Sequence, residues 1–477
     1  MQMQRVTRHY KAQNRKWGEL FITGMITCCV LGTIYIFNIG ITTLALIGSF
    51  ILLYLLRYPR KTFLLFVFSI PLGEIFIDTG IISISAPNVL MLIIVFALFM
   101  RFIISSPDLS LPQIIKVNLI ALFFFIFSYL VADLHAKDVI YALNNSTIII
   151  GFALSFVFPL ILIRSLDEYR KVFIFQVISA LLLAIFSILA SFGYGPVQYG
   201  GIFTPRFASA NRVIMGKYAT QAFMASRGGY GCWLESAISI LAVSIFCKRK
   251  FFFKNKFPVI LIFPIMLLAV IIPTSRSTWL ATSLALIVIL YFTLFVLKKQ
   301  HYFSLTVTPL FISLLVILVF WPPDMVKSLI WKIYEMNPSS VEDRFLEVQE
   351  GFRVGIRNLL FGLGAGGYSA YVQPFSKVIP GMCIHNVFAA TFADGGILGF
   401  ISLVIIWIIS FYICLQIIMK PKNEVIRLFA ISMFATLIAI FTETNFYGGG
   451  DKIMWLMLGL TNCLYLLSYR MEIIKGV

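Results

Sequence analysis

The chain has 477 residues, of which 60% are hydrophobic and only 12% are charged. Its mean hydropathy of +0.95 is higher than soluble globular domains of ordinary composition reach. The formal net charge is +18 at pH 7. Composition therefore excludes an ordinary soluble domain and predicts an all-α polytopic membrane protein.

Fourteen apolar segments come close to the roughly 17–25 residues that a membrane span needs. We expect one integral membrane domain over residues 1–477, with spans near 18–37, 40–56, 62–78, 89–104, 117–132, 147–164, 172–192, 229–246, 258–273, 278–297, 303–321, 395–418, 425–443 and 453–469. The segment before the first span is basic and polar and has no small-residue cleavage site, which predicts an uncleaved cytoplasmic tail.

Lysine and arginine concentrate in alternate loops, as they do on the cytoplasmic side of membrane proteins. With both termini in the cytoplasm, the cytoplasmic loops contain about two-thirds of the 38 basic residues. The positive net charge therefore indicates orientation in a multi-pass membrane protein, and it does not predict nucleic-acid binding.

Two connections on the outer side are long: 193–228 and 322–394. Long irregular segments in compact proteins tend to be functional, and these two are rich in apolar and aromatic residues. In the second, Ser339 and Glu342 have the spacing of a capping box. An apolar stripe from Val341 to Leu359 follows at helical spacing. The pattern predicts an amphipathic helix near 340–360 that lies along the outer membrane interface.

Carboxylates gather on this predicted helix, at Glu342, Asp343, Glu347 and Glu350. They could form an acid/base pair or a metal site, but we expect them to lie on the solvated polar face of the helix. No spacing of His and Asp predicts a metal. Another carboxylate, Glu235, lies inside the eighth span. It must pair with a cation or face a cavity, and the sequence does not identify its partner.

Basic residues on the outer side are informative because the positive-inside bias does not explain them. Most could belong to ordinary solvated loop surfaces. Arg276 differs, because it lies in a very short turn between two apolar spans, where a cation is a functional candidate. The eleven candidates, apart from the isolated Lys137 and Lys452, are Arg206, Arg212, Lys217, Arg227, Arg276, Lys327, Lys332, Arg344, Arg353, Arg357 and Lys377.

A glycine-rich loop, Gly362–Gly367, and a His385-Asn386 pair follow the predicted helix. The loop N–H groups of Gly362, Gly364 and Gly366 could bind phosphate oxygens, or the glycines could serve a turn that needs positive φ. His385 could take a proton from an alcohol near neutral pH, or it could serve as a structural histidine at a helix start.

Four elements in order carry a resemblance to a known family over about 265–445. The C-terminal half resembles the O-antigen polymerase and O-antigen ligase superfamily of bacterial envelope polysaccharide assembly. The four elements are Thr274–Ser277, Asp343–Phe345, Phe361–Tyr368, and His385-Asn386 followed by Gly395–Phe400. An arginine-x10-glycine pattern of polymerase loops also appears twice, as Arg344/Gly355 and Arg353/Gly364.

The resemblance implies a metal-independent, inverting glycosyltransferase without a cofactor, whose donor is a glycan on undecaprenyl diphosphate. It implies that His385 is the base and that Arg276 and Arg344 stabilise the leaving diphosphate. The further residues expected to bind the diphosphate or the substrate are Arg206, Arg212, Arg353, Gly362, Gly364, Gly366 and Asn386. The implied location is the bacterial inner membrane, with the active site at the periplasmic face.

Polymerase and ligase differ in their acceptor, which is another lipid-linked repeat unit or a lipid A-core sugar. Two long outer loops could hold two sugar chains, which favours a polymerase making O-antigen, capsule or exopolysaccharide. A chain-length regulator and a flippase are the expected protein partners. Two alternatives from other classes are a transporter of lipid-linked sugars and a membrane scaffold. Cys232 and Cys383 lie near the outer face, and no spacing pattern shows whether they pair.

Overall fold

The computed structural model describes residues 39–72, 76–78, 83–104, 111–191, 213–214, 217–218, 227–246, 257–271, 275–297, 338–372, 384–421, 423–447 and 452–475. The spans predicted at 18–37 and 303–321 lie outside these residues, as does most of the loop 193–228 with Arg206 and Arg212. Cys383 also lies outside them.

The chain divides into two compact units. The smaller comprises residues up to Phe66 together with Pro87–Ser110. Its described helices are α2 (Ile39–Arg57), most of α3 (Pro59–Ser69) and α4 (Ala86–Ile104). Within this unit, the Arg101 guanidinium donates to the Arg57 carbonyl at 3.2 Å.

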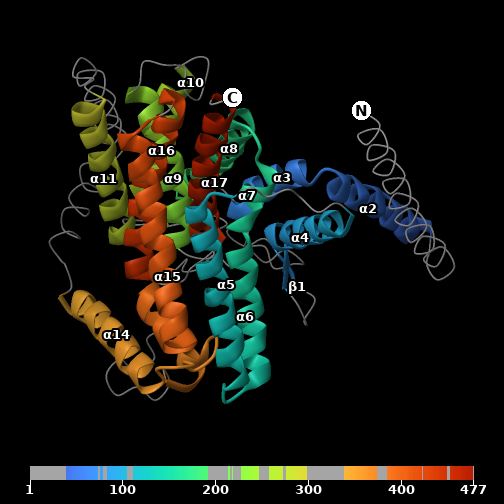
Figure 1. Cartoon of the computed structure of the whole chain (residues 1–477), viewed down its shortest axis with the longest axis vertical. Helices are drawn as coiled ribbons and strands as arrows, with labels where there is room; N and C mark the ends of the chain where they lie inside the picture. The colour runs from blue at the N-terminus through green and yellow to red at the C-terminus, as the bar shows by residue number, and fades with distance from the viewer. Residues whose placement is uncertain are drawn as a thin grey trace. The chain divides into compact units, whose positions relative to one another are not determined.

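The larger unit is a helical bundle that contains the rest of the described chain (Figure 1). Its helices are α5 (Gln113–Leu134), α6 (Val139–Leu154), α7 (Val157–Leu162), α8 (Leu166–Ser191), α9 (Arg227–Phe246), α10 (Phe257–Ile271), α11 (Arg276–Tyr291), α14 (Pro338–Arg357), α15 (Val387–Met419), α16 (Glu424–Tyr447) and α17 (Lys452–Lys475). Helical turns occur at η1 (Ile70–Leu72), η2 (Phe292–Val296) and η4 (Tyr368–Val372). Two antiparallel hairpins pair β1 (Phe76–Asp78) with β2 (Ser83–Ser85), and β3 (Val213–Ile214) with β4 (Lys217–Tyr218).

Seven of the described helices are long and apolar enough to cross a membrane, so the protein is a polytopic membrane protein. The count of fourteen spans is a prediction that the described residues do not confirm. The span predicted at 62–78 is wrong: α3 ends at Ser69, and η1 and strand β1 follow. Pro71 has no backbone N–H and disfavours helical backbone at the residue before it, so the apolar run does not continue as a helix.

The centre of the larger unit is formed by α9, α16 and α17, whose described side chains are mostly buried. α9 packs against α8, α10, α11 and α16. Trp233, Trp407 and Trp455 are fully buried. On α5 and α6, large apolar side chains such as Phe123 and Ile140 are exposed instead. Such exposed apolar surface is expected on helices whose outer faces contact lipid.

Helix α15 is broken near its start. Gly396 has φ 68° and ψ −169°, which divides the 33-residue helix into a short first segment, 387–395, and a long second segment, 397–419. A Cβ on Gly396 would lie 2.8 Å from the Leu360 carbonyl oxygen. The backbone N–H of Ile397 donates to the Leu359 carbonyl at 2.8 Å. The break therefore lets the chain after α14 pack directly on α15.

Candidate active site

Helix α14 lies beside the first segment of α15, at one end of the bundle (Figure 1). Two glycines on α14 permit this close packing. A Cβ on Gly351 would lie 2.9 Å from the Cβ of Ala389, and one on Gly355 would overlap the ring of Phe392. Gly355 is the glycine of the first arginine-x10-glycine pattern. In the structure, its missing side chain lets α14 and α15 approach each other.

Glu347 is the centre of the polar contacts between α14 and the residues before α15. Its Oε2 atom accepts from the His385 backbone N–H at 3.2 Å and lies 2.9 Å from His385 Nδ1. Arg344 Nη1 donates to the same oxygen at 2.9 Å. The Glu347 side chain is 3% exposed, compared with 23% for His385 and 35% for Arg344. A buried carboxylate therefore joins the two predicted catalytic residues.

The pKa of Glu347 reflects two opposing effects. Burial by itself raises the pKa of a carboxyl group. The hydrogen bond from His385, the charge of His385 and the charge and hydrogen bond of Arg344 outweigh burial, and the pKa of Glu347 is lowered from its ordinary value. Glu347 is therefore ionised at neutral pH and can only accept hydrogen bonds. The proton in the contact with His385 must then be carried by Nδ1 of the imidazole.

The expectation that the α14 carboxylates lie on a solvated face is wrong for Glu347 and Glu350, which are 2% and 1% exposed. Each is neutralised by an arginine three residues away; Arg353 Nε donates to Glu350 at 2.7 Å. The helix begins at Pro338, one residue before Ser339, so Ser339 is not the residue before the first turn.

Part of the apolar stripe of α14 points away from the protein, whereas Val348 and Phe352 of the stripe pack against the protein. Phe345 and Ile356, which belong to that stripe, are 78% and 66% exposed. The face that packs on α15 includes Glu347, Gly351 and Val354, together with the ring of Phe352. In a membrane protein, such an exposed apolar stripe is the surface that fits a lipid interface.

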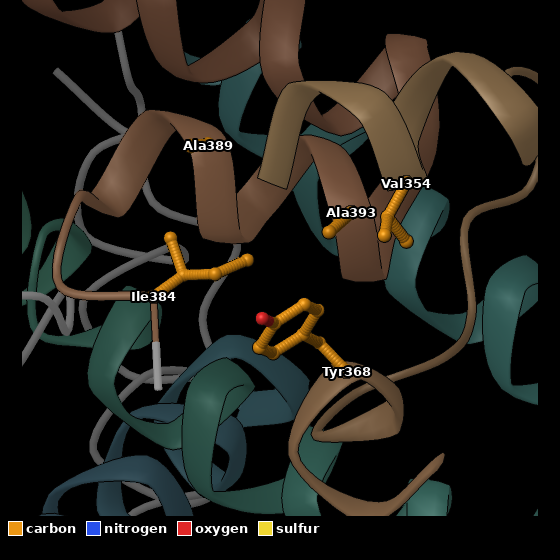
Figure 2. Packing of buried hydrophobic residues seen from close by; sticks show 5 residues of the cluster. All are labelled: Val354, Tyr368, Ile384, Ala389 and Ala393. Carbon is orange, nitrogen blue, oxygen red and sulfur yellow. The ribbon is translucent and has the colours of Figure 1, made fainter. Parts of the chain in front are cut away.

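A small apolar cluster fixes α14, η4 and the start of α15 to one another. Val354, Tyr368, Ile384, Ala389 and Ala393 are its buried members, and Figure 2 shows them around a common centre. Since Ile384 immediately precedes His385, this packing determines where the imidazole lies.

Asn386 is the N-cap of α15. Its Oδ1 atom accepts from the Ala389 backbone N–H at 2.9 Å, and its Nδ2 atom donates to Asn445 Oδ1 at 2.6 Å. These contacts connect the residue after His385 to the end of α16. The amide of Asn386 thus has a structural role here, and substrate binding by it stays a prediction.

The glycine-rich loop binds an internal carboxylate. The backbone N–H of Gly366 donates to Asp394 Oδ2 at 3.1 Å, and that of Tyr368 donates to Oδ1 at 2.9 Å. The N–H groups of Gly362 and Gly364 donate to the carbonyls of Asn358 and Asp394. These N–H groups are therefore engaged within the protein, and phosphate binding by them stays a prediction.

The structure supports the other alternative for the loop glycines, namely that they serve a turn that needs positive φ. Gly362, Gly364 and Gly366 have φ of 68°, 83° and 72°. In addition, Ala365 N–H donates to Oδ1 of Asp133 at 2.9 Å, which attaches the loop to the end of α5.

Arg276 is the first residue of α11 and is exposed. Within the described residues it has no hydrogen bond or ion pair, so the structure does not bring it into direct contact with Arg344 or His385. It is connected to them indirectly. The carboxyl of Glu443 on α16 lies beside Ser277 and Thr278, which follow Arg276. Asn445, two residues after Glu443, contacts Asn386.

Sequence reasoning missed Glu347, Asp394 and Asp133. Glu347 could have been found from its spacing of three residues after Arg344, which allows an ion pair on one helix. Asp133 is 232 residues from its partner Ala365, and no local pattern predicts such a pairing. Cys232 is buried.

Comparison with known proteins gives a family match. No curated protein matches the chain. Residues 261–404 match the family described as O-antigen ligase. This segment includes Arg276, Arg344, the glycine-rich loop and His385, as well as the break at Gly396. It lies largely within the stretch of about 265–445 that carried the resemblance. The match confirms that resemblance for this segment, which is similar to the O-antigen polymerase and ligase superfamily of glycan-transferring enzymes.

Proposed function

We propose that the protein is a glycosyltransferase that polymerises oligosaccharide repeat units carried on undecaprenyl diphosphate, at the outer face of the bacterial inner membrane. The observation that carries the proposal is the contact of His385 with buried Glu347, beside Arg344. A carboxylate that holds an imidazole by Nδ1 fixes its tautomer and orients Nε2 as a general base.

In the proposed reaction, His385 Nε2 removes the proton of the acceptor hydroxyl. The acceptor oxygen then attacks the anomeric carbon of the donor sugar from the face opposite the leaving group, with inversion. The bond from that carbon to the diphosphate oxygen breaks, and undecaprenyl diphosphate leaves with the electron pair. The proton stays on His385, where the negative charge of Glu347 stabilises the imidazolium.

Guanidinium groups supply the positive charge that the leaving diphosphate needs. Arg344 and Arg353 are partly exposed on α14, and Arg276 is exposed at the start of α11. The remaining N–H groups of Arg344 and Arg353 can donate to a ligand, because each carboxylate contacts only part of its guanidinium. Arg206 and Arg212 complete the proposed set, with Gly362, Gly364 and Gly366 shaping the loop and Asn386 at the same helix start.

The alternative acceptor is a lipid A-core sugar, which would make the protein an O-antigen ligase. The matched family is described as O-antigen ligase, which favours this alternative, whereas the two long outer loops favour the polymerase. A transporter of lipid-linked sugars is less well supported, because the candidate residues gather where α14 meets the start of α15. A chain-length regulator and a flippase are the proposed protein partners.

Complementation of a strain that lacks the protein tests the proposal. The variants are wild type, His385→Ala and, as a matched histidine control, His301→Ala in a predicted cytoplasmic segment. Surface polysaccharide and lipid-linked intermediates are separated by size. If the protein is a polymerase, His385→Ala removes long chains while single repeat units still reach the acceptor lipid. Long polymers held on the lipid carrier would indicate a ligase, and full rescue by His385→Ala would exclude His385 from the mechanism.

Chelation tests the proposed metal-free mechanism. With purified protein and lipid-linked donor, transfer should continue in excess EDTA, because the arginines supply the charge that a metal would otherwise supply. Strong inhibition that a divalent ion reverses would contradict this part of the proposal.

A further inference from the structure

Two glutamates face each other inside the larger unit, apart from the site described above. Glu235 on α9 is fully buried, and Glu443 on α16 is 1% exposed. Their carboxyl groups lie close enough to interact directly. Glu443 is the partner of Glu235 that the sequence does not identify, and it is another acid where a cation was expected.

The space around the two glutamates depends on a glycine of α9. A Cβ on Gly231 of α9 would lie 2.8 Å from Glu443 Oε1 and 2.6 Å from Thr278 Oγ1, so only glycine leaves space for both groups. Thr278 is fully buried, and among the described residues its hydroxyl has no hydrogen-bond partner of good geometry. The same holds, within that part of the chain, for all four carboxyl oxygens.

Charge excludes two ionised carboxylates in this position. Two negative charges at close range in an apolar bundle repel strongly and lose their hydration. In the described part of the chain, neither carboxyl has a lysine or arginine at ion-pair distance. Of the charged groups on the packed elements, Arg276 is exposed, Asp394 binds the glycine-rich loop, His385 contacts Glu347, and Lys452 lies over the Phe152 ring.

The position of Glu443 connects the pair to both ends of the proposed site. Ser277 and Thr278 beside it directly follow Arg276 on α11. Asn445, less than one helical turn after it, accepts from Asn386, which directly follows His385. Glu443 therefore lies on the stretch of α16 that is adjacent to both segments, the one that carries Arg276 and the one that carries His385.

We propose that Glu235 and Glu443 share one proton and together act as a positioning pair, which holds the start of α11 and the start of α15 in register for the transfer reaction. The shared proton lets one carboxyl donate to the other, so the pair carries a single negative charge. The positioning part of this inference rests on the proposed function, and the proton sharing does not.

Thermal unfolding of the purified full-length protein in detergent tests the proton sharing without reference to activity. We expect the wild-type unfolding midpoint to fall as the pH is raised from about 6 to about 9, because loss of the shared proton creates two facing charges. Glu235→Gln and Glu443→Gln each leave at most one charge, so the midpoint of either variant should fall by less than half as much. Parallel falls in all three proteins would overturn the proposal.

A metal cation in place of the proton gives a different result. Millimolar MgCl2 or CaCl2 would then raise the wild-type midpoint and leave that of Glu443→Gln unchanged. Such a rise in wild type alone would also overturn the shared proton. The expected result is no difference between the two proteins in either salt.

Transfer assays test the positioning role. Glu443→Gln keeps the shape and one hydrogen bond, so its kcat should stay within about threefold of wild type. Glu443→Ala should lower kcat by at least about tenfold with a smaller change in KM, because the substrate-binding groups remain. Equal kcat for Glu443→Ala and wild type would reject positioning. Loss of transfer in wild type itself would refute the proposed function and leave the unfolding result standing.

Discussion

Glu347 shows how one residue determines the chemistry of its neighbours. It is buried, ionised and in contact with both His385 and Arg344. Because an ionised carboxylate accepts but does not donate, it decides which imidazole nitrogen carries the proton. It also restrains Arg344 without removing the guanidinium from the surface.

Removal of the carboxylate should reduce transfer more than binding. We expect Glu347→Gln to lower kcat by about 10² to 10³-fold, because an amide cannot stabilise the imidazolium or impose its tautomer. The measurement is steady-state transfer with a lipid-linked donor. The control is Glu342→Gln, an exposed position on the same helix. A kcat for Glu347→Gln near that of the control would show that His385 acts without this carboxylate.

Acidic pH should destabilise the folded protein through protonation of Glu347. The pKa of Glu347 in the folded protein is below its ordinary value of 4.5. The stability contributed by its contacts is therefore fully present above that ordinary value and is lost as the pH falls through the lower folded-state pKa. Unfolding midpoints between about pH 6 and about pH 3 should fall more steeply for wild type than for Glu347→Gln. If the midpoints of the two proteins fell equally with pH, the pKa of Glu347 would not be lowered in the folded protein.

At the scale of elements, the candidate site forms where α14, the glycine-rich loop and α15 approach one another closely. This approach depends on backbone that only glycine adopts easily. Gly362 has φ 68°, and a Cβ there would overlap the Asp394 carbonyl group. The capping-box signal and the spacing of apolar residues predicted α14, but they could not predict which of its faces packs on the protein. That choice depends on Gly351 and Gly355 meeting α15, which is a tertiary contact.

Gly362→Ala should destabilise the larger unit by about 2 kcal/mol or more, because strain at positive φ adds to the overlap. Gly48→Ala is the matched control, since a Cβ on Gly48 of α2 has no atom within 4 Å. Alanine also favours helix over glycine, so this control should be neutral or slightly stabilising. Thermal unfolding in detergent compares the two, and equal midpoints would mean that the loop readily adopts another conformation.

The apolar stripe of α14 should contact lipid. In membranes containing the full-length protein, a cysteine at Ile356→Cys should react at least about tenfold more slowly with a charged thiol reagent than one at Arg357→Cys, since the two positions are about 100° apart on the helix. In the structure both residues are exposed, so protection by protein does not explain a difference. Equal rates would place the stripe in water.

At the scale of the whole molecule, the membrane class and most helices of the larger unit follow from hydropathy. The predicted spans at 117–132, 425–443 and 453–469 lie inside α5, α16 and α17. The segment 62–78 fails because length and apolar composition do not detect a helix stop at Pro71. The candidate site was predictable in its exposed members, His385 and Arg344. Its buried members were not, because hydropathy places carboxylates such as Glu347 and Glu443 in water unless their partners are known.

At the scale of the whole molecule, we predict the orientation of the chain in the membrane. A reporter that is active only in the cytoplasm should be active when fused after Val477, and one that is active only outside should be active when inserted between α16 and α17. The basis is the concentration of basic residues in alternate loops. The opposite pattern would move Arg344 and His385 to the cytoplasmic side and exclude a periplasmic site.

Asp394 has a consequence for the energetics of turnover. Because the Asp394 carboxyl group accepts hydrogen bonds from the N–H groups of Gly366 and Tyr368, the loop is held in its folded conformation by a contact within the protein. An incoming donor therefore does not have to offset the conformational entropy of ordering that loop. Preorganisation of this kind leaves more of the donor's binding free energy available for alignment of the anomeric carbon with the acceptor hydroxyl.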